Sequence, residues 1–279
     1  MMQAHAFAKV NLALIVYPRT ADGFHPISGI FQSVSLSDTI VIADARNDSV
    51  NVSNDEAPAD TSNLAFSALD AARRAARVSL PMSIDITKRI PAGAGLGGGS
   101  ADAAATLGLM AKRFRLDEDT IGDIAASLGA DVPFSYIGGS CRVEGRGERI
   151  RPMEPLNNFA LAIVVPPFAL GTQEVFGRWD ELGGPVGDVM SDAALPPALR
   201  GGEEIRNDLY PAAASLDERI AQWRDELQAR WGTEVAMTGS GSALFAFFSS
   251  MDEAADAASS VDMPNRAAEA VSLVPTGWE

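Results

Sequence analysis

The order of the expected elements predicts an α+β fold made of two packed domains. Strand patterns come first, helical patterns gather in the middle, and strand patterns return, which differs from the regular alternation of a doubly wound sheet. The 279 residues are also many for one domain and suit two. We place the boundary between residues 152 and 158, with an N-terminal domain over 1–155 and a C-terminal domain over 156–279.

The first ninety residues predict four strands and one helix. Residues 6–17 alternate in polarity, and Lys9 and Asn11 lie on the face opposite the large apolar side chains. Asn63 starts a helical pattern that runs to Ala76. The further strands cover 30–42, 48–53 and 83–88.

Two helices and a hairpin are expected in the middle of the chain. Ser100 is a good N-cap for an alanine-rich helix that ends near Phe114. A second helix covers 117–128 and stops at Gly129. Residues 136–151 have the pattern of a hairpin.

The C-terminal part combines strands, helices and one long connection. Residues 181–205 are rich in glycine and proline and predict a surface connection. One helix is expected to carry Leu216, Ile220, Trp223 and Leu227 on a single face. The remaining elements are a strand over 159–165, a strand pair around the turn 238–242, a helix over 251–259 and a strand over 267–274.

Composition narrows the possible partners. Lysine and arginine total 22 against 37 aspartate and glutamate residues, a net charge of −15, which disfavours nucleic acid and anionic membrane surfaces. One cysteine, Cys141, and two histidines exclude a disulfide framework and the usual zinc site. Because no membrane span or signal peptide is evident, we expect a cytoplasmic protein. The sequence does not indicate an oligomeric state.

The segment PAGAGLGGGS at 91–100 is the strongest functional signal. Its glycines let the main chain approach a ligand and take positive φ, and the helix after it offers unpaired amides to an anion. It lacks the Lys-Ser/Thr ending of a P-loop, and it lies too far along the chain for a dinucleotide fingerprint. The candidate phosphate-binding residues are Pro91, Ala92, Gly93, Ala94, Gly95, Leu96, Gly97, Gly98, Gly99 and Ser100.

Lys9 and Asp131 form a candidate catalytic pair. A lysine inside an apolar strand is costly unless it is paired or faces a site, and Val132-Pro133 restricts the backbone beside Asp131. A carboxylate that takes a hydroxyl proton beside a lysine suits phosphoryl transfer. Lys9 as a strand-edge residue and Asp131 as a simple cap are the alternatives.

Two shorter segments are weaker candidates. Phe24-His25 could stack on a base and hydrogen-bond it, or be an ordinary loop pair. The turn at 238–242 could be a plain hairpin or a wall of the phosphate pocket.

Several of these segments resemble the galactokinase–homoserine kinase–mevalonate kinase–phosphomevalonate kinase (GHMP) superfamily, and most closely its family of 4-diphosphocytidyl-2-C-methyl-D-erythritol kinases. The resemblance spans nearly the whole chain. The matching segments are AKVNLAL at 8–14, DGFHPISGIFQSVSLSD at 22–38, GLGGGSADAAA at 95–105, GADVPF at 129–134, NDL at 207–209 and TGSGSALF at 238–245.

This resemblance implies a ribosomal-S5-like N-terminal domain, an α/β C-terminal domain and an active site between them. It implies ATP and Mg²⁺ as cofactors and the 2-hydroxyl of a cytidine diphosphate-linked methylerythritol as acceptor. By position, Lys9 and Asp131 match the catalytic pair. The implied substrate-binding residues are Asn11, Phe24, His25, Gly239, Ser240 and Gly241.

The chain departs from the family pattern at two positions. Ala101 stands where the family often has a second serine, and Phe24 stands where it often has tyrosine. The magnesium ligands are not indicated. The alternatives are a related kinase for mevalonate, homoserine or a sugar, a decarboxylase of the superfamily, and a nucleotide-binding regulator without catalysis. A nicotinamide enzyme is disfavoured by the position of the glycine loop.

Overall fold

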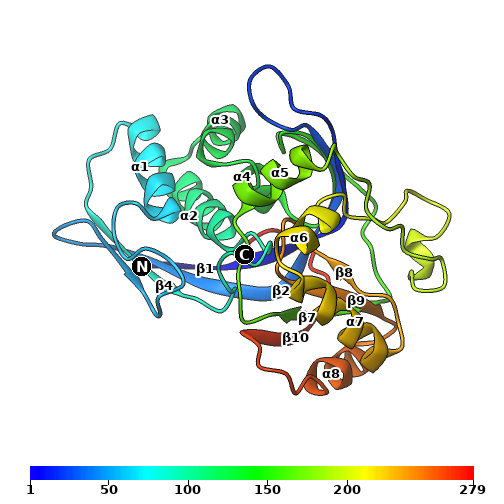
Figure 1. Ribbon diagram of the computed structural model, residues 1–279. Coiled ribbons are helices and arrows are strands. Elements are labelled where there is room, and N and C mark those ends of the chain that lie inside the picture. Colours follow the sequence, from blue (N-terminus) through cyan, green and yellow to red (C-terminus); the bar gives the residue numbers. More distant parts are fainter.

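The computed structural model describes all 279 residues and contains two β-sheets with helices packed on them (Figure 1). The first sheet has six strands in the order β3-β4-β2-β5-β6, with β1 pairing along β2. Only β3 and β4 are parallel. Its strands are β1 (Met2–Val16), β2 (Ile27–Asp44), β3 (Ser49–Val52), β4 (Met82–Thr87), β5 (Ser140–Gly145) and β6 (Arg149–Pro152).

The second sheet is antiparallel and has the order β10-β7-β9-β8. Its strands are β7 (Ala160–Val165), β8 (Ala236–Met237), β9 (Leu244–Phe248) and β10 (Ala267–Val271). These two sheets confirm the predicted α+β fold with two domains. The last strand of the first sheet ends at residue 152 and the next strand starts at 160. The boundary at 155 stays a prediction.

Four helices belong to each half of the chain. Those of the N-terminal half are α1 (Leu64–Ala76), α2 (Gly98–Phe114), α3 (Glu118–Leu128) and α4 (Val132–Ile137). Those of the C-terminal half are α5 (Thr172–Glu181), α6 (Tyr210–Leu216), α7 (Arg219–Trp231) and α8 (Met251–Ser259), and a short 3₁₀ turn covers Pro197–Leu199. No helix has the length and apolarity that a bilayer crossing requires.

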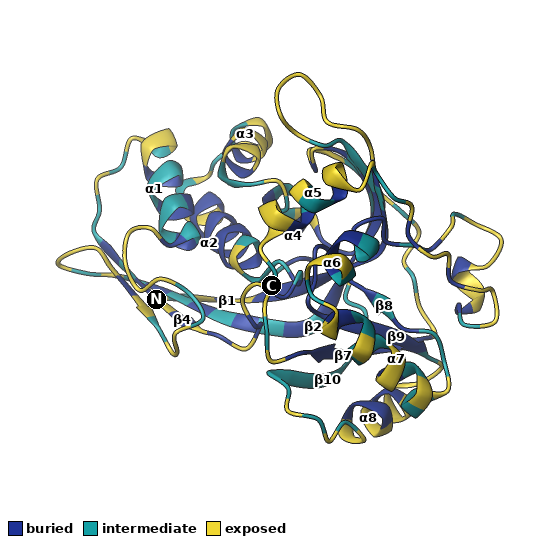
Figure 2. Cartoon of the chain, viewed as in Figure 1, coloured by how far each residue is buried: buried dark blue, intermediate teal, exposed yellow.

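Helix α2 is surrounded on all sides, which its alanine-rich sequence permits. Residues 101–111 are all buried, and Figure 2 shows this helix beneath more exposed neighbours. The indole of Trp278 packs so closely that a Cβ at Gly108 would lie 2.0 Å from it. Small side chains therefore let α2 pack against β1, α1, α4 and the C-terminal tail.

The C-terminal tail returns to the N-terminal sheet. The amide of His5 donates to the carbonyl of Glu279 over 2.7 Å, and the amide of Glu279 donates back over 3.1 Å. The amide of Phe7 bonds the carbonyl of Gly277 over 2.9 Å. The last residues thus extend the N-terminal sheet along the free edge of β1.

The beginning of α2 differs from the sequence-based expectation. The helix starts at Gly98 and its N-cap is Gly97, which has φ of 71°, whereas Ser100 was expected as the cap. Glycine can take the left-handed conformation that turns the chain into the helix at this point. The helix N-terminus therefore belongs to the glycine segment itself.

Three further predictions need correction. Residues 132–137 form helix α4, for which no helix is predicted and whose last two residues fall in the predicted hairpin; Pro133 can stand at its start because the first amides of a helix need no partner. Helix α5 was not predicted. The single helix expected through Leu216 and Leu227 is interrupted at Asp217, whose extended backbone ends α6 and whose carboxylate accepts the amide of Arg219.

The long connection after α5 is present as expected, with only the 3₁₀ turn inside it. The connection does not lie wholly on the surface, because four of its side chains are buried in the largest hydrophobic cluster: Met190, Leu195, Leu199 and Ile205.

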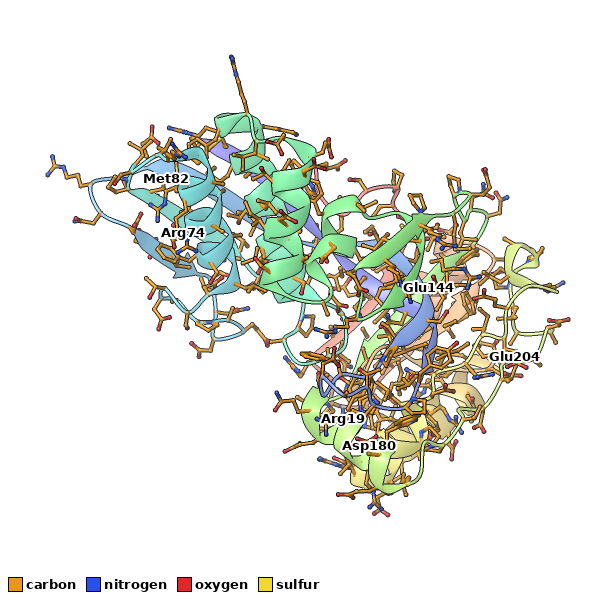
Figure 3. All side chains as sticks on the ribbon, turned by 90° about the horizontal axis from the view of Figure 1, so that it is seen from above. Arg19, Arg74, Met82, Glu144, Asp180 and Glu204 are labelled. Carbon is orange, nitrogen blue, oxygen red and sulfur yellow. The ribbon has the colours of Figure 1, made fainter.

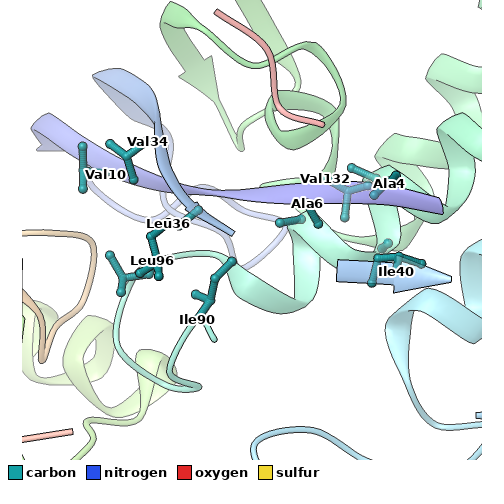
Figure 4. Packing of buried hydrophobic residues seen from close by; sticks show 14 of the residues in the cluster. Ala4, Ala6, Val10, Val34, Leu36, Ile40, Ile90, Leu96 and Val132 are labelled. Atoms are coloured by element: carbon teal, nitrogen blue, oxygen red, sulfur yellow. The ribbon is translucent and has the colours of Figure 1, made fainter. Parts of the chain in front are cut away.

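The core also holds the glycine segment in place. Ile90 and Leu96 pack with Val10, Val34 and Leu36 (Figure 4). Burial of these side chains anchors an otherwise permissive stretch of main chain just before its start and in its middle.

Candidate active site

One cleft of about 1100 Å³ brings nearly all the candidate residues together. All ten residues of the phosphate segment line it, as do Lys9, Asn11 and Asp131 from the N-terminal half. Phe24, His25, Gly239 and Ser240 also line it. Gly241 does not, because it faces Met237 and Leu170.

The phosphate segment alternates between left-handed glycines and buried apolar residues. Gly93, Gly95 and Gly97 have φ of 62°, 76° and 71°, while Ala94 and Leu96 between them are 1% exposed. Successive amides in such a chain form a concave anion site, which the positive end of α2 strengthens. The amide of Ala92 is already bonded to Glu56 over 2.6 Å.

Lys9 packs directly against this segment. A Cβ at Gly97 would lie 3.0 Å from Cγ of Lys9, so the lysine stem occupies the space that a side chain would need. The Lys9 ammonium donates to Oδ1 of Asn11 over 2.5 Å and lies 3.5 Å from Oδ2 of Asp131. Lys9 is only 5% exposed, so it is not a strand-edge residue.

Asp131 lies at the start of helix α4 but does not cap it. Its carboxylate accepts no amide of the helix and instead faces Lys9. About a third of its side chain is exposed, at 32%. A carboxylate held beside a buried ammonium and open to the cleft is placed to receive a proton from a bound hydroxyl group.

The turn 238–241 is both a hairpin connection and a wall of the cleft. It joins β8 to β9, and Oγ1 of Thr238 accepts the amide of Asn11 over 2.8 Å. A Cβ at Gly239 would lie 3.2 Å from Oδ1 of Asn11 and from Cα of Gly95. The turn thus contacts strand β1 and the phosphate segment at the same time.

Phe24 and His25 line the cleft from the loop between β1 and β2. Phe24 is 54% exposed, and the guanidinium of Arg146 lies 4.4 Å from its ring centroid. Nδ1 of His25 lies 3.1 Å from the carbonyl of Tyr17, and because a carbonyl only accepts, Nδ1 must carry the hydrogen. Nε2 of His25 lies 3.2 Å from a carboxylate oxygen of Asp180.

The imidazole of His25 has a defined setting. It stacks on the ring of Phe176 at 5.3 Å, and Asp180 follows one turn later on helix α5. Arg19 and Asp180, both in the cleft wall, are labelled near each other in Figure 3. His25 is therefore ordered by contacts from both halves of the chain rather than by its loop alone.

A buried charged cluster lies beneath the phosphate segment. Lys88 bonds Oδ2 of Asp102 over 2.8 Å and also bonds Asp38. Asp38 in turn accepts the amides of Arg89 and Ile90 over 2.6 and 2.9 Å. Burial raises the pKa of the Asp102 carboxyl, and its Oδ1 has no hydrogen-bond partner.

Several cleft residues were missed by sequence reasoning. Among them, only Lys88 could have been recognised from the sequence, because it ends a predicted strand just before the glycine segment. The other residues come from loops and helices without a recognisable motif. The missed residues include Arg19, Glu56, Ala57, Pro58, Asn63, Leu64, Lys88, Asp102, Arg146, Gln173, Phe176 and Asp180.

Comparison with known proteins gives matches over most of the chain. The family model "GHMP kinases N terminal domain" matches residues 63–139, and "GHMP kinases C terminal" matches 197–264. The 4-diphosphocytidyl-2-C-methyl-D-erythritol kinase of Carboxydothermus hydrogenoformans is 32% identical over 275 residues, which cover 95% of this chain and 94% of the relative. That of Moorella thermoacetica is 37% identical over 252 residues, 86% of this chain and 87% of the relative.

Solved structures agree with these relatives. A crystal structure of 4-(cytidine 5'-diphospho)-2C-methyl-D-erythritol kinase matches with a TM-score of 0.81 and 33% identity, covering 98% of this chain and 99% of the other. Homoserine kinase from Cytophaga hutchinsonii, at 16% identity and a TM-score of 0.70 over 100% of this chain and 96% of the other, shares the fold. The chain belongs to the GHMP kinases, within the family of 4-diphosphocytidyl-2-C-methyl-D-erythritol kinases.

Proposed function

We propose that this protein transfers the γ-phosphoryl group of ATP to the 2-hydroxyl of 4-diphosphocytidyl-2-C-methyl-D-erythritol in non-mevalonate isoprenoid precursor biosynthesis. One observation carries the proposal. The Lys9–Asp131 pair lies in the same cleft as the phosphate segment and in contact with it. Membership of the kinase family supports the same reaction.

ATP would bind along the glycine wall. The amides of residues 93–100 and the start of α2 would hold its phosphate oxygens through hydrogen bonds and the helix dipole. The nucleoside would extend toward the loop before α1, because Pro58, Asn63 and Leu64 line that part of the cleft. In this arrangement the terminal phosphate would point toward Lys9.

Asp131 would orient the acceptor hydroxyl and take its proton as the new P–O bond forms. Lys9 would stabilise the negative charge that spreads over the transferred group, and its bond to Asn11 fixes the ammonium for that task. The pair is also the reason to disfavour a regulator without catalysis, which needs no such buried ammonium beside a carboxylate.

The cytidine end of the acceptor would bind at Phe24 and His25. The exposed ring of Phe24 offers a face for a pyrimidine. Nδ1 of His25 is held by Tyr17, so the base would hydrogen-bond Nε2 of His25 in place of Asp180. Phe176, on which His25 stacks, supplies a second ring in the same wall.

Magnesium fits the donors in this cleft. The ion takes oxygen ligands and is usually held by phosphates, water and one or two carboxylates. Among the carboxylates on the phosphate side, Asp131 faces Lys9 and Glu56 accepts the amide of Ala92, whereas Oδ1 of Asp102 has no other partner. Asp102 would hold Mg²⁺ once its carboxyl has lost its proton, and the ion would neutralise phosphate charge when bound. A cytoplasmic location stays a prediction.

A coupled ADP-release assay with a panel of acceptors tests the function. We expect ADP formation with the cytidyl substrate and none above background with mevalonate or homoserine. A higher kcat/KM with mevalonate or homoserine would assign the protein to another activity of the superfamily. ATP binding without ADP formation for any acceptor would favour the regulator.

A further inference from the structure

Asn207 lies just outside the cleft, in the segment that precedes helix α6. It is 7% exposed, and the short stretch around it pairs with the far end of strand β1. The amide of Leu14 donates to the carbonyl of Arg206 over 2.8 Å, and the amide of Asp208 donates to the carbonyl of Leu14 over 2.9 Å. Asn207 is therefore fixed on the strand that carries Lys9 and Asn11.

The side-chain amide of Asn207 forms hydrogen bonds with backbone groups only. Nδ2 donates to the carbonyl of Met237 over 2.7 Å and to that of Gly239 over 2.8 Å. Oδ1 accepts the amide of Leu209 over 2.9 Å. Two donors and one acceptor on so short a stem are what asparagine provides.

The carbonyls that Asn207 holds belong to the turn 238–241 and the strand before it. This turn accepts the amide of Asn11 through Thr238 and lies against Gly95 of the phosphate segment. Just beyond it, the amide of Ala243 donates to the carbonyl of Ala94 over 3.1 Å. A shift of the turn would therefore move the phosphate segment relative to Asn11.

We propose that Asn207 is a positioning residue, which sets the separation between the phosphate segment and the Lys9–Asn11 strand by holding the turn 238–241. Asn207 does not line the cleft, so it acts through the turn and not on the substrate. The expected effect of Asn207 on kcat rests on the proposed kinase activity. Its hold on the turn 238–241 does not depend on that activity.

The test compares Asn207→Asp with the wild-type protein. The substitution keeps the shape and the bond to Leu209 but places an oxygen against two carbonyls in place of two N–H donors. We expect kcat to fall about 10–100-fold, since misplacing reacting groups by about 1 Å can cost 10²-fold. The KM for the cytidyl substrate should change by less than about threefold, because Phe24 and His25 lie elsewhere.

Asn265→Asp is the matched control, because Nδ2 of Asn265 also donates to a backbone carbonyl, that of Met263, away from the cleft. It should keep the wild-type kcat. Asn207→Ser retains a single donor and should lose less activity than Asn207→Asp. Asn207→Ser takes the place of Asn207→Asp in the kinetic test if the aspartate variant does not fold. Wild-type kcat per folded molecule in either Asn207 variant would overturn the proposal.

Amide hydrogen exchange gives a readout that does not depend on the reaction. The Asn11 amide, which bonds the turn, should exchange faster in Asn207→Asp, whereas the Phe7 amide, which bonds Gly277, should not change. Unchanged exchange at Asn11 would contradict the role. An inactive wild-type protein would instead count against the proposed function, and the exchange result would still decide the role of Asn207.

Discussion

The backbone amide of Lys9 donates a 3.0 Å hydrogen bond to the carbonyl of Leu96, so the strand with the candidate catalytic lysine is joined directly to the phosphate segment. The same lysine stem fills the space above Gly97. Main chain and side chain of one residue thus fix the ammonium relative to the phosphate site. This coupling gives several expectations for variants.

Asp131→Ala should remove turnover and spare nucleotide binding. We expect kcat to fall roughly 10²–10⁴-fold if the carboxylate is the general base. The affinity for ATP should stay near the wild-type value, because the phosphate segment is unchanged. Steady-state kinetics and calorimetric titration with an ATP analogue measure the two quantities. Asp123→Ala, on the exposed side of α3, is the control, and wild-type turnover in Asp131→Ala would refute the assignment.

Gly97→Ala should weaken ATP binding and lower stability. The residue has φ of 71°, and its new methyl group would lie 3.0 Å from Cγ of Lys9. We expect a loss of at least about 1 kcal/mol in the free energy of unfolding together with a raised KM for ATP. Gly122→Ala, inside α3 with open space around it, should instead gain about 0.5–1 kcal/mol. Equal stability of the two variants would speak against this account.

His25→Ala should raise the KM for the cytidyl substrate far more than the KM for ATP. The imidazole contacts Phe176 and Asp180 on helix α5 and no residue of the phosphate segment. Kinetics with each substrate varied in turn separate the two constants. His5→Ala, with an exposed side chain, provides the control. Parallel rises in both constants would favour a kinase with another acceptor.

Asp102→Asn should change how stability depends on pH. Burial raises the pKa of this carboxyl in the folded protein, so the native state keeps a proton that the unfolded chain has already released. Stability contributed by this group is present below the ordinary carboxyl pKa near 4 and falls as pH rises toward the native pKa, by at most about 1.4 kcal/mol per pH unit. Asp102→Asn has no carboxyl group at this position, so its stability does not fall with rising pH for this reason.

Urea unfolding without nucleotide or metal, at several pH values between about 5 and 8, measures the effect. The free-energy difference between Asp102→Asn and the wild-type protein should shift in favour of the variant as pH rises. Asp123→Asn, which is exposed, should show no such trend. A difference that stays constant with pH would show that Asp102 is ionised throughout in the folded protein.

Local patterns in the sequence were enough to predict the phosphate segment and the candidate pair. Five glycines before an alanine-rich helix are more than a plain turn requires, and a lysine such as Lys9 in an apolar strand needs a partner. The Asp38–Lys88–Asp102 cluster was not predictable, because Asp38 is 50 residues from Lys88 and only the fold joins them. Helix α4 was missed because six residues carry no periodic signal.

The tail beyond β10 has a bearing on engineering within this family. Residues of the second half complete the edge of β1, and the indole of Trp278 fills the groove that Gly108 leaves open. A chimera that took its second half from a relative would also take from that relative the residues that pair with β1 and the side chain that packs against Gly108. Exchanging acceptor preference between members of the family would therefore require matching two contact surfaces, one at the cleft and one along the edge of β1 and α2.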